Sequence, residues 1–205
     1  MRVVFIFIVI LVLIALAAPA TFAVQIWLDG QSTIARAEQR GALGRVRAGR
    51  LSAAEYTIAM NEFRETWRSR AMPCRTLANL WADLTTESAP DTLPISHKLA
   101  GSLMQRREMS IRWQVRRLIV SCQLEQRYDD RQMLRLWLDD ASFGGDVVGL
   151  EGAAQAIFNK PSSALDRNES ARLAALLRAP SLLTQPERWT ERAGEIEQRV
   201  ASRAH

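Results

Sequence analysis

The chain has 205 residues, of which 48% are hydrophobic and 24% are charged, and its formal net charge is +5. This composition is typical of a globular chain with room for one core, and it excludes an intrinsically disordered protein. Nearly all of the positive charge is arginine, since the chain has two lysines, Lys98 and Lys160. A basic balance fits nucleic acid, an anionic membrane surface or a phosphate-bearing substrate, and does not choose among them.

The N-terminal segment predicts where the chain resides. Residues 3–24 contain no charged residue and follow Met1 and Arg2. A membrane-spanning helix needs about 20 such residues, so we expect residues 1–28 to form a transmembrane anchor. The positive-inside rule then places Arg2 in the cytoplasm and the body outside it. The small residues at 18–23 also fit a cleaved signal peptide; both alternatives deliver the body to the same compartment, which argues against nucleic acid as a partner.

The rest of the chain is expected to be helical. Residues 29–50 are rich in Arg, Ala and Gly and fit either a juxtamembrane helix or a loose tether. Ser52 and Glu55 have the spacing of a capping box, which predicts a helix beginning near Ala53. Hydrophobic periodicity predicts further helices, and no segment has the sustained alternation of a sheet strand. These helices are expected at 75–84, 110–128, 130–138, 151–158 and 168–177, with a loop at 85–94.

The two cysteines, Cys74 and Cys122, have neither metal-ligand spacing nor the number needed for a disulfide framework. Two alternatives remain open from the sequence. The cysteines are either small apolar residues inside helices or, in a periplasmic body, the two halves of a single disulfide.

A family resemblance emerges in residues 121–181. This stretch reads S-C-Q-L-E-Q-R-Y, R-Q-M-L-R-L-W-L, F-G-G, G-L-E-G-A-A-Q and S-A-R-L-A-A-L-L-R-A-P-S. It resembles the second half of a glycosyltransferase family 51 (peptidoglycan transglycosylase) domain. That family has L-E-R-R-Y, I-L-x-x-Y-L-N, Y-F-G, G-x-E-A-A-A and a helix ending in A-P-S, in the same order and at the same gaps.

The resemblance implies an all-α, lysozyme-like domain at residues 51–205, behind one N-terminal transmembrane helix. It also implies a place on the bacterial inner membrane, with the body in the periplasm. The family polymerises lipid II into glycan strands and releases undecaprenyl pyrophosphate. This chemistry needs a carboxylate as general base on the acceptor hydroxyl. It also needs positive groups, in some members with a divalent metal, on the leaving pyrophosphate.

The motifs before Ser121 depart from the family's pattern. In the first motif, E-D-x-x-F-x-x-H-x-G, Glu62 matches the glutamate and the other four defined positions differ. By resemblance, Glu62 is the candidate general base. The alternative is an ordinary solvated carboxylate on a surface helix.

The second motif, G-x-S-T-I-T-Q-Q-x-x-K-N, aligns with residues 91–102. Ser96 stands for a threonine, His97 and Lys98 stand for the two glutamines, and Gly101 takes the place of the lysine. Lys98 could still contact a phosphate from a different turn of the helix, whereas an isolated histidine is more often incidental than catalytic.

The third motif, R-K-x-x-E-x-x-x-A-x-x-L-E, ends with a match at Leu124 and Glu125, but Trp113 and Gln114 replace its basic pair. Arg117 stands where the family has a second functional glutamate, so the charge at that position is reversed. Arg112 and Arg116 partly restore the lost basic pair, about a residue out of register. If Arg117 lies in a cleft opposite Glu62, the site has been inverted rather than shifted.

Two functions follow from this pattern. The first is a working peptidoglycan glycosyltransferase with Glu62 as base and Ser96, Lys98, Arg112 and Arg116 binding substrate. The second is a catalytically inactive member that binds lipid II, nascent glycan or a cell-wall synthase as a scaffold or regulator. A third alternative is a helical membrane protein with chance similarity. The retained residues are packing residues and the lost ones are polar, so the sequence supports the fold more firmly than the activity.

Overall fold

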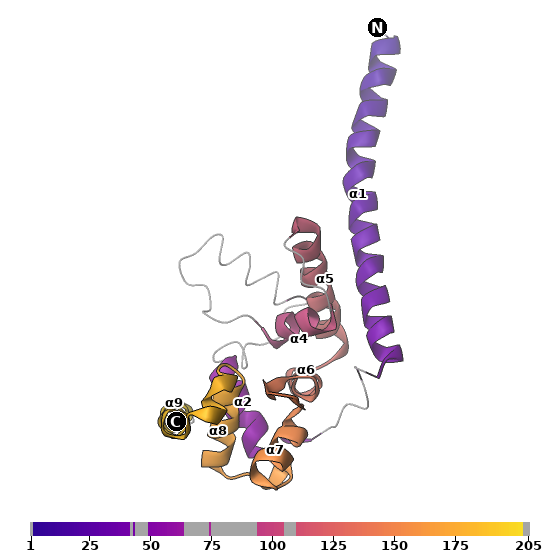
Figure 1. Cartoon of the computed structure of the whole chain (residues 1–205). Helices are drawn as coiled ribbons and strands as arrows, with labels where there is room; N and C mark the ends of the chain where they lie inside the picture. The colour runs from indigo at the N-terminus through magenta and orange to yellow at the C-terminus, as the bar shows by residue number, and fades with distance from the viewer. Residues whose placement is uncertain are drawn as a thin grey trace.

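The computed structural model describes residues 2–41, 43, 49–63, 74, 94–104 and 110–202, and the side chains from residue 21 onward within these ranges. The expected all-α class is confirmed, apart from one small hairpin (Figure 1). The helices are α1 (Arg2–Gln39), α2 (Ala53–Glu62), α4 (Ile95–Leu103), α5 (Ile111–Arg127), α6 (Asp130–Asp139), α7 (Leu150–Phe158), α8 (Arg167–Leu176) and α9 (Pro186–Ala201).

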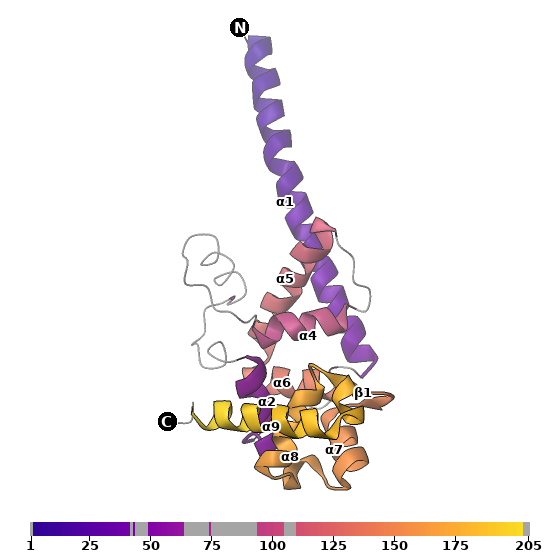
Figure 2. The ribbon, with the colours of Figure 1, turned by 60° about the vertical axis from the view of Figure 1, so that its left-hand side comes forward.

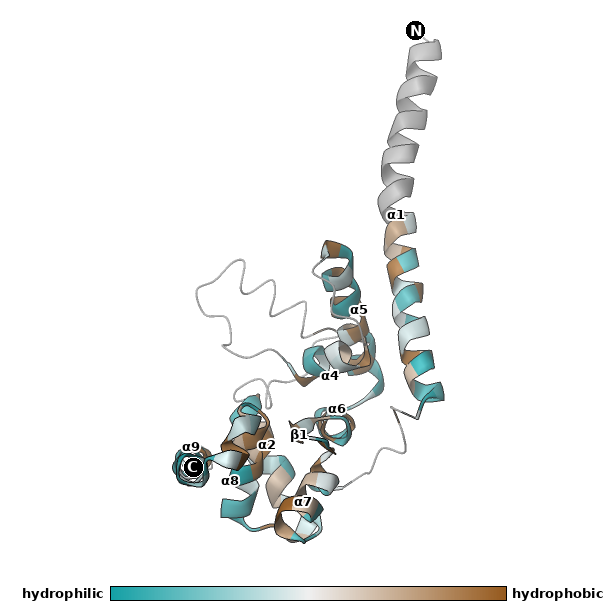
Figure 3. Ribbon diagram, in the orientation of Figure 1, coloured by the Kyte–Doolittle hydropathy of each residue, from teal (hydrophilic) through white to brown (hydrophobic). Residues whose placement is uncertain are grey.

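Helix α1 is long and continuous, and its last turns lie beside α5 (Figures 1 and 2). Residues 29–39 are therefore helical, which decides between the two alternatives for this part of the chain. Hydrophilic residues gather toward the end of α1 that lies next to the body (Figure 3). Among the residues whose side chains are described, no helix is both long and apolar enough to cross a membrane. The anchor prediction rests on the uncharged stretch 3–24, and most of it, residues 3–20, lies outside those residues.

Helix starts follow the local sequence closely. Ser52 accepts a hydrogen bond from the backbone N–H of Glu55, and the Glu55 side chain accepts one from the N–H of Ser52, so α2 begins at Ala53 as predicted. The same reciprocal capping box begins α6 and α8. The helix expected at 75–84 and the loop expected at 85–94 lie outside the described residues, apart from Pro94.

The hairpin that interrupts the helices joins β1 (Ser142–Gly144) to β2 (Val147–Val148). Gly144 and Gly145 both have positive φ, 110° and 56°, which side chains with a Cβ rarely adopt. The Phe-Gly-Gly sequence therefore makes a tight reversal rather than a simple helix stop. It also buries Phe143 in the core.

Packing builds one core across two groups of helices. Helix α2 packs against α8 and α9, whereas α4 packs against α5 and α6. Helix α9 was not predicted from the sequence, although Trp189, Ala193 and Ile196 recur at helical spacing and are buried. This arrangement brings the C-terminal end of α2 close to α4 and to the end of α8.

Cys74 and Cys122 form a disulfide, with their Cα atoms 4.8 Å apart. The structure thus decides between the two alternatives for the cysteines. The bond closes a loop that contains all of α4 and most of α5.

Candidate functional site

Glu62 is a buried carboxylate with two cationic partners. Only 3% of the surface of Glu62 is exposed to solvent. Lys98 Nζ donates to Glu62 Oε2 at 2.6 Å, and Arg178 Nε donates to Glu62 Oε1 at 2.7 Å. The amide of Asn61 also donates to Oε1, at 3.2 Å, and its carbonyl oxygen accepts from Arg199 at 3.0 Å. Glu62 is therefore not the solvated surface residue that the sequence left open.

The position of Glu62 explains why it needs cations. It is the last residue of α2, where the helix dipole places partial negative charge. Burial there penalises the charged carboxylate and raises its pKa, but the hydrogen bonds and charges of Arg178 and Lys98 outweigh that effect. The pKa of Glu62 consequently lies below its usual value. The carboxylate is ionised at neutral pH and is a weak proton acceptor while both cations remain in place.

Lys98 connects this carboxylate to an aromatic pair. Its Nζ lies 5.3 Å from the centroid of the Phe63 ring and 4.8 Å from that of Trp137, and the two rings meet edge to face. Cation–π contacts of this kind hold an ammonium group without removing its hydrogen-bonding capacity. The Lys98 side chain is 36% exposed, so its head group is reachable from solvent.

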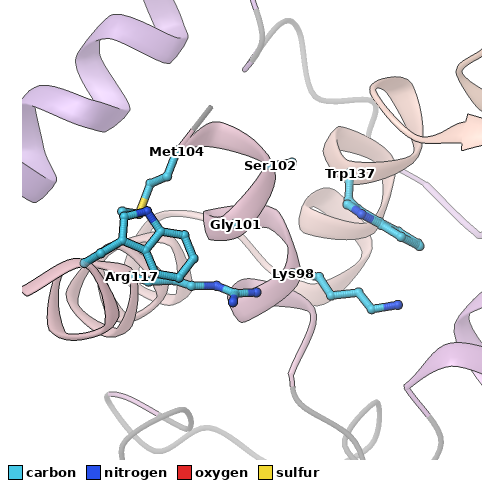
Figure 4. Close-up of a pocket in the computed structure, with 7 residues that line it drawn as sticks. Lys98, Gly101, Ser102, Met104, Arg117 and Trp137 are labelled. Carbon is cyan, nitrogen blue, oxygen red and sulfur yellow. The ribbon is translucent and has the colours of Figure 1, made fainter. Parts of the chain in front are cut away.

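Lys98 also lines a cavity of about 430 Å³ (Figure 4). Its lining combines cationic groups with indole rings: Lys98, Gly101, Ser102, Met104, Trp113, Arg117 and Trp137. Among the described lining residues there is no carboxylate. Such a cavity suits an anionic group attached to a body with apolar faces.

Arg117 reaches the cavity from α5 and lies against α4. Its guanidinium donates twice to the backbone oxygen of His97, at 3.1 and 3.0 Å, and lies over the Trp113 ring at 5.4 Å. Gly101 permits this approach, because a Cβ at Gly101 would be 2.8 Å from an Arg117 nitrogen. The Arg117 guanidinium thus fills the space next to Gly101, the residue that aligns with the lysine of the second motif.

The cavity therefore has Arg117 in its wall and is joined to Glu62 through Lys98. Glu62 itself is not among the residues that line the cavity, so an inverted site stays a prediction. A divalent metal does not fit this arrangement, since both oxygens of Glu62 already accept hydrogen bonds from cations and the described cavity lining contains no carboxylate. Within the described ranges, no cluster of three or more His, Cys, Asp or Glu side chains could hold a metal ion.

His97 is buried beneath this wall. Burial, and secondarily the charge of Arg117, lower its pKa to about 4. Its Nδ1 has no hydrogen-bond partner among the described residues. His97 is therefore neutral at physiological pH, and we interpret it as a packing residue of α4 rather than a charged group.

The other predicted site residues lie elsewhere. Ser96 is buried and donates to Glu125. Arg112 forms an exposed ion pair with Asp29, and Arg116 donates to Thr33, so both arginines contact α1. The structure brings together Glu62 and Lys98 and does not add Ser96, Arg112 or Arg116 to them; a binding role for those three stays a prediction. The first-motif positions after Phe63 lie outside the described residues.

Three residues at this site were missed by the sequence analysis. Trp113 and Trp137 line the cavity, and Arg178 holds Glu62 across a separation of 116 residues. The sequence analysis assigned no binding role to either tryptophan or to Arg178. No local pattern links Arg178 to Glu62, because the pairing depends on how α2 packs against α8.

The sequence of this chain is similar to a family model and to several known proteins. A family model described as Transglycosylase matches residues 75–204. Penicillin-binding protein 1C of Escherichia coli is 30% identical over 154 residues, covering 72% of this chain and 20% of that protein. Penicillin-binding protein 1A of Aquifex aeolicus is 29% identical over 109 residues, covering 52% of this chain and 15% of that protein. A biosynthetic peptidoglycan transglycosylase of Escherichia coli is 44% identical over 57 residues, covering 28% of this chain and 24% of that protein. The chain thus spans a quarter or less of each of these relatives.

Proposed function

Because this chain belongs to the transglycosylase family, we propose that it acts on lipid II in the synthesis of cell-wall glycan strands. The cavity between α4, α5 and α6 is the proposed binding site for the diphosphate-linked sugar. One observation carries the proposal. A cavity with two cations and two indoles in its wall is joined through Lys98 to the buried carboxylate of Glu62.

The chemistry of the lining supports this substrate class. A diphosphate carries concentrated negative charge, and Lys98 and Arg117 supply charge-assisted donors from two different helices. The rings of Trp113 and Trp137 add apolar faces against which a sugar can lie. The cavity volume, about 430 Å³, falls within the range of small-ligand sites.

In the proposed reaction, Glu62 takes the proton of the acceptor hydroxyl while that oxygen bonds to the donor sugar. The bond between the donor sugar and the diphosphate breaks, and the diphosphate leaves with the electron pair. Lys98 and Arg117 stabilise the charge that develops on the leaving group. No metal is needed for this scheme, because the two side-chain cations occupy the position where charge develops.

A second candidate function is binding without transfer. Glu62 is held by Lys98 and Arg178, which lower its pKa and weaken it as a base. Arg117 also stands where the family has its second glutamate. In this form, the chain would bind lipid II or nascent glycan and act as a scaffold or regulator of a cell-wall synthase.

The proposed location is the bacterial inner membrane, crossed once by residues 1–28, with the body in the periplasm. The uncharged stretch 3–24 has the length of a membrane span. The disulfide fits an oxidising compartment such as the periplasm. Carbonate extraction followed by N-terminal sequencing tests this location; a soluble product beginning near Val24 would replace the anchor with a cleaved signal peptide.

The activity is tested by lipid II polymerisation with the purified full-length protein in detergent, beside its Glu62→Gln variant. Glycan strands from the wild type that are lost in the variant support transfer with Glu62 as base. Strands from both proteins would mean that another group is the base. Lipid II binding without strands from either protein supports the second candidate, and the absence of both binding and strands refutes the proposal.

A further inference from the structure

We propose that Lys98 is shared between two competing anions: Glu62 in the empty site and a diphosphate group in the loaded cavity. Entry of the diphosphate withdraws Lys98 from Glu62 and so releases one carboxylate oxygen to act as a proton acceptor. This inference rests on the proposed function, since it assumes that the cavity takes a diphosphate.

The position of Lys98 carries the first step. The side chain that donates to Glu62 Oε2 at 2.6 Å also lines the cavity. Its ammonium group lies over Trp137, which is part of the same cavity wall. Lysine has a flexible four-carbon stem and an ammonium group with three donors. A rotation about that stem is enough to transfer the group from the carboxylate to a ligand at the wall.

The second step is that Glu62 can release Lys98 without becoming an unpaired buried charge. Removing the last partner of a buried ion is strongly unfavourable. Here Arg178 and Asn61 both donate to Oε1, whereas among the described residues the hydrogen bond to Oε2 comes from Lys98. Departure of Lys98 therefore leaves the carboxylate paired and frees a defined atom, Oε2.

Arg117 supplies the attraction on the cavity side. Its two hydrogen bonds to the His97 oxygen fix the guanidinium at the wall before any ligand arrives. A diphosphate there gains Arg117 and Lys98 together, whereas Glu62 keeps Arg178. Each anion then retains a cation, so the exchange moves one ion pair and leaves no buried charge uncompensated.

The functional consequence is a base that is paired when the site is empty and becomes available when substrate is bound. The weak basicity of Glu62 in this structure is then a property of the empty site. Lys98 is a positioning residue in this scheme as well as a ligand for the diphosphate.

Calorimetric titration of inorganic pyrophosphate into the full-length protein in detergent tests the competition. Glu62→Gln keeps the size of the side chain and removes the competing charge, so pyrophosphate should bind about tenfold more tightly, the size of a strong pairwise coupling. Lys98→Met should weaken binding. In the Lys98→Met background, the gain from Glu62→Gln should disappear, because no shared cation remains.

A matched control separates competition from general electrostatics. Glu125→Gln removes a carboxylate charge that is bonded to Ser96 and does not line the cavity, and it should change pyrophosphate affinity less than twofold. Thermal unfolding of each variant confirms that it is folded before titration. A gain from Glu62→Gln that survives in the Lys98→Met background would overturn the proposal, as would no gain at all.

The lipid II polymerisation assay and the pyrophosphate titration test separate claims, so either claim can fail while the other stands. Glycan strands without coupling between Glu62 and Lys98 would leave the enzyme function standing and refute the exchange. Coupling without strands would support the exchange at a site that binds and does not transfer.

Discussion

The helices before Tyr128 and those after it share one core but differ sharply in what they bury. Among the described residues, eight buried polar or charged side chains lie in α1, α2, α4 and α5: Thr33, Thr57, Asn61, Glu62, Ser96, His97, Ser121 and Gln123. The part from α6 to α9 buries one, Ser170. Polar groups are costly to bury unless they are paired. The asymmetry therefore indicates that the first part gives up some stability in order to form a site.

The two parts also differ in how they are held together. The second part relies on apolar packing and on capping boxes at α6 and α8. The first part contains the buried carboxylate of Glu62, most of the cavity lining and the disulfide, whereas Arg178 and Trp137 reach the site from the second part. The fold is therefore stabilised mainly by ordinary apolar packing, whereas the site depends on specific pairings between residues that are distant in the sequence.

The largest expected effect is loss of the disulfide. Cys74→Ser with Cys122→Ser should lower the free energy of unfolding by about 4 kcal/mol, because the bond closes a loop with a sequence separation of 48. Urea unfolding with and without reductant measures it. The double variant should not respond to reductant, whereas wild type should; equal stability of oxidised and reduced wild type would contradict the prediction.

A core truncation in the second part should rank next. Leu173 on α8 is fully buried, so Leu173→Ala should cost about 3 kcal/mol in the free energy of unfolding. Leu183→Ala is the matched control, because Leu183 is 37% exposed and the same truncation there should cost less than about 0.5 kcal/mol. Equal losses at the two positions would show that α8 is not part of the core.

The buried histidine makes the stability of the first part depend on pH between about 6.5 and 4. The pKa of His97 is about 4 in the folded chain and 6.5 when unperturbed, so the unfolded chain binds its proton more tightly. This contribution to stability is complete above about pH 6.5 and is lost as the pH falls toward 4, at about 1.4 kcal/mol per pH unit. Glu62 acts separately. Its lowered pKa adds stability above its unperturbed value of 4.5, which is lost as the pH falls below that value.

His97→Gln should remove most of the stability slope between pH 6.5 and 4.5 while leaving the loss at lower pH, where Glu62 is protonated. Unfolding curves of wild type and variant at pH 7, 5.5 and 4.5 measure the difference. Parallel losses in both proteins over this interval would contradict a buried neutral His97.

The smallest effect is expected at the contact between α1 and α5. Arg112 and Asp29 are 66% and 40% exposed in their side chains, and exposed ion pairs contribute about 0.2–1 kcal/mol. Arg112→Gln should therefore change the free energy of unfolding by less than about 1 kcal/mol, an effect that salt reduces. A loss of several kcal/mol would mean that the two helices depend on this pair.

Sequence reasoning succeeded where structure is decided locally. The capping box at Ser52, the periodicity of α5 and the start of α6 after Asp129 each predicted an element correctly. Helix α9 was missed although its buried residues recur at helical spacing. The pairing of the Phe-Gly-Gly segment into a hairpin was not predicted, because it requires knowing what lies opposite.

The site was predictable only in part. Glu62 and Lys98 were identified through alignment to family motifs, and the structure brings them together. Arg112 and Arg116 were chosen because they are close in sequence to the lost basic pair, but their helix face contacts α1. Arg178 joins the site through the packing of α2 against α8, a long-range contact that no local pattern encodes.

The most direct test of the central claim is lipid II affinity after the same substitution at two arginines of α5. Arg117 lines the cavity and Arg112 contacts α1. Arg117→Gln should weaken lipid II binding about tenfold or more, the effect of a lost charged hydrogen bond, whereas Arg112→Gln should change it less than twofold. Equal losses, or a larger loss at Arg112, would contradict the assignment of the cavity as the lipid II site.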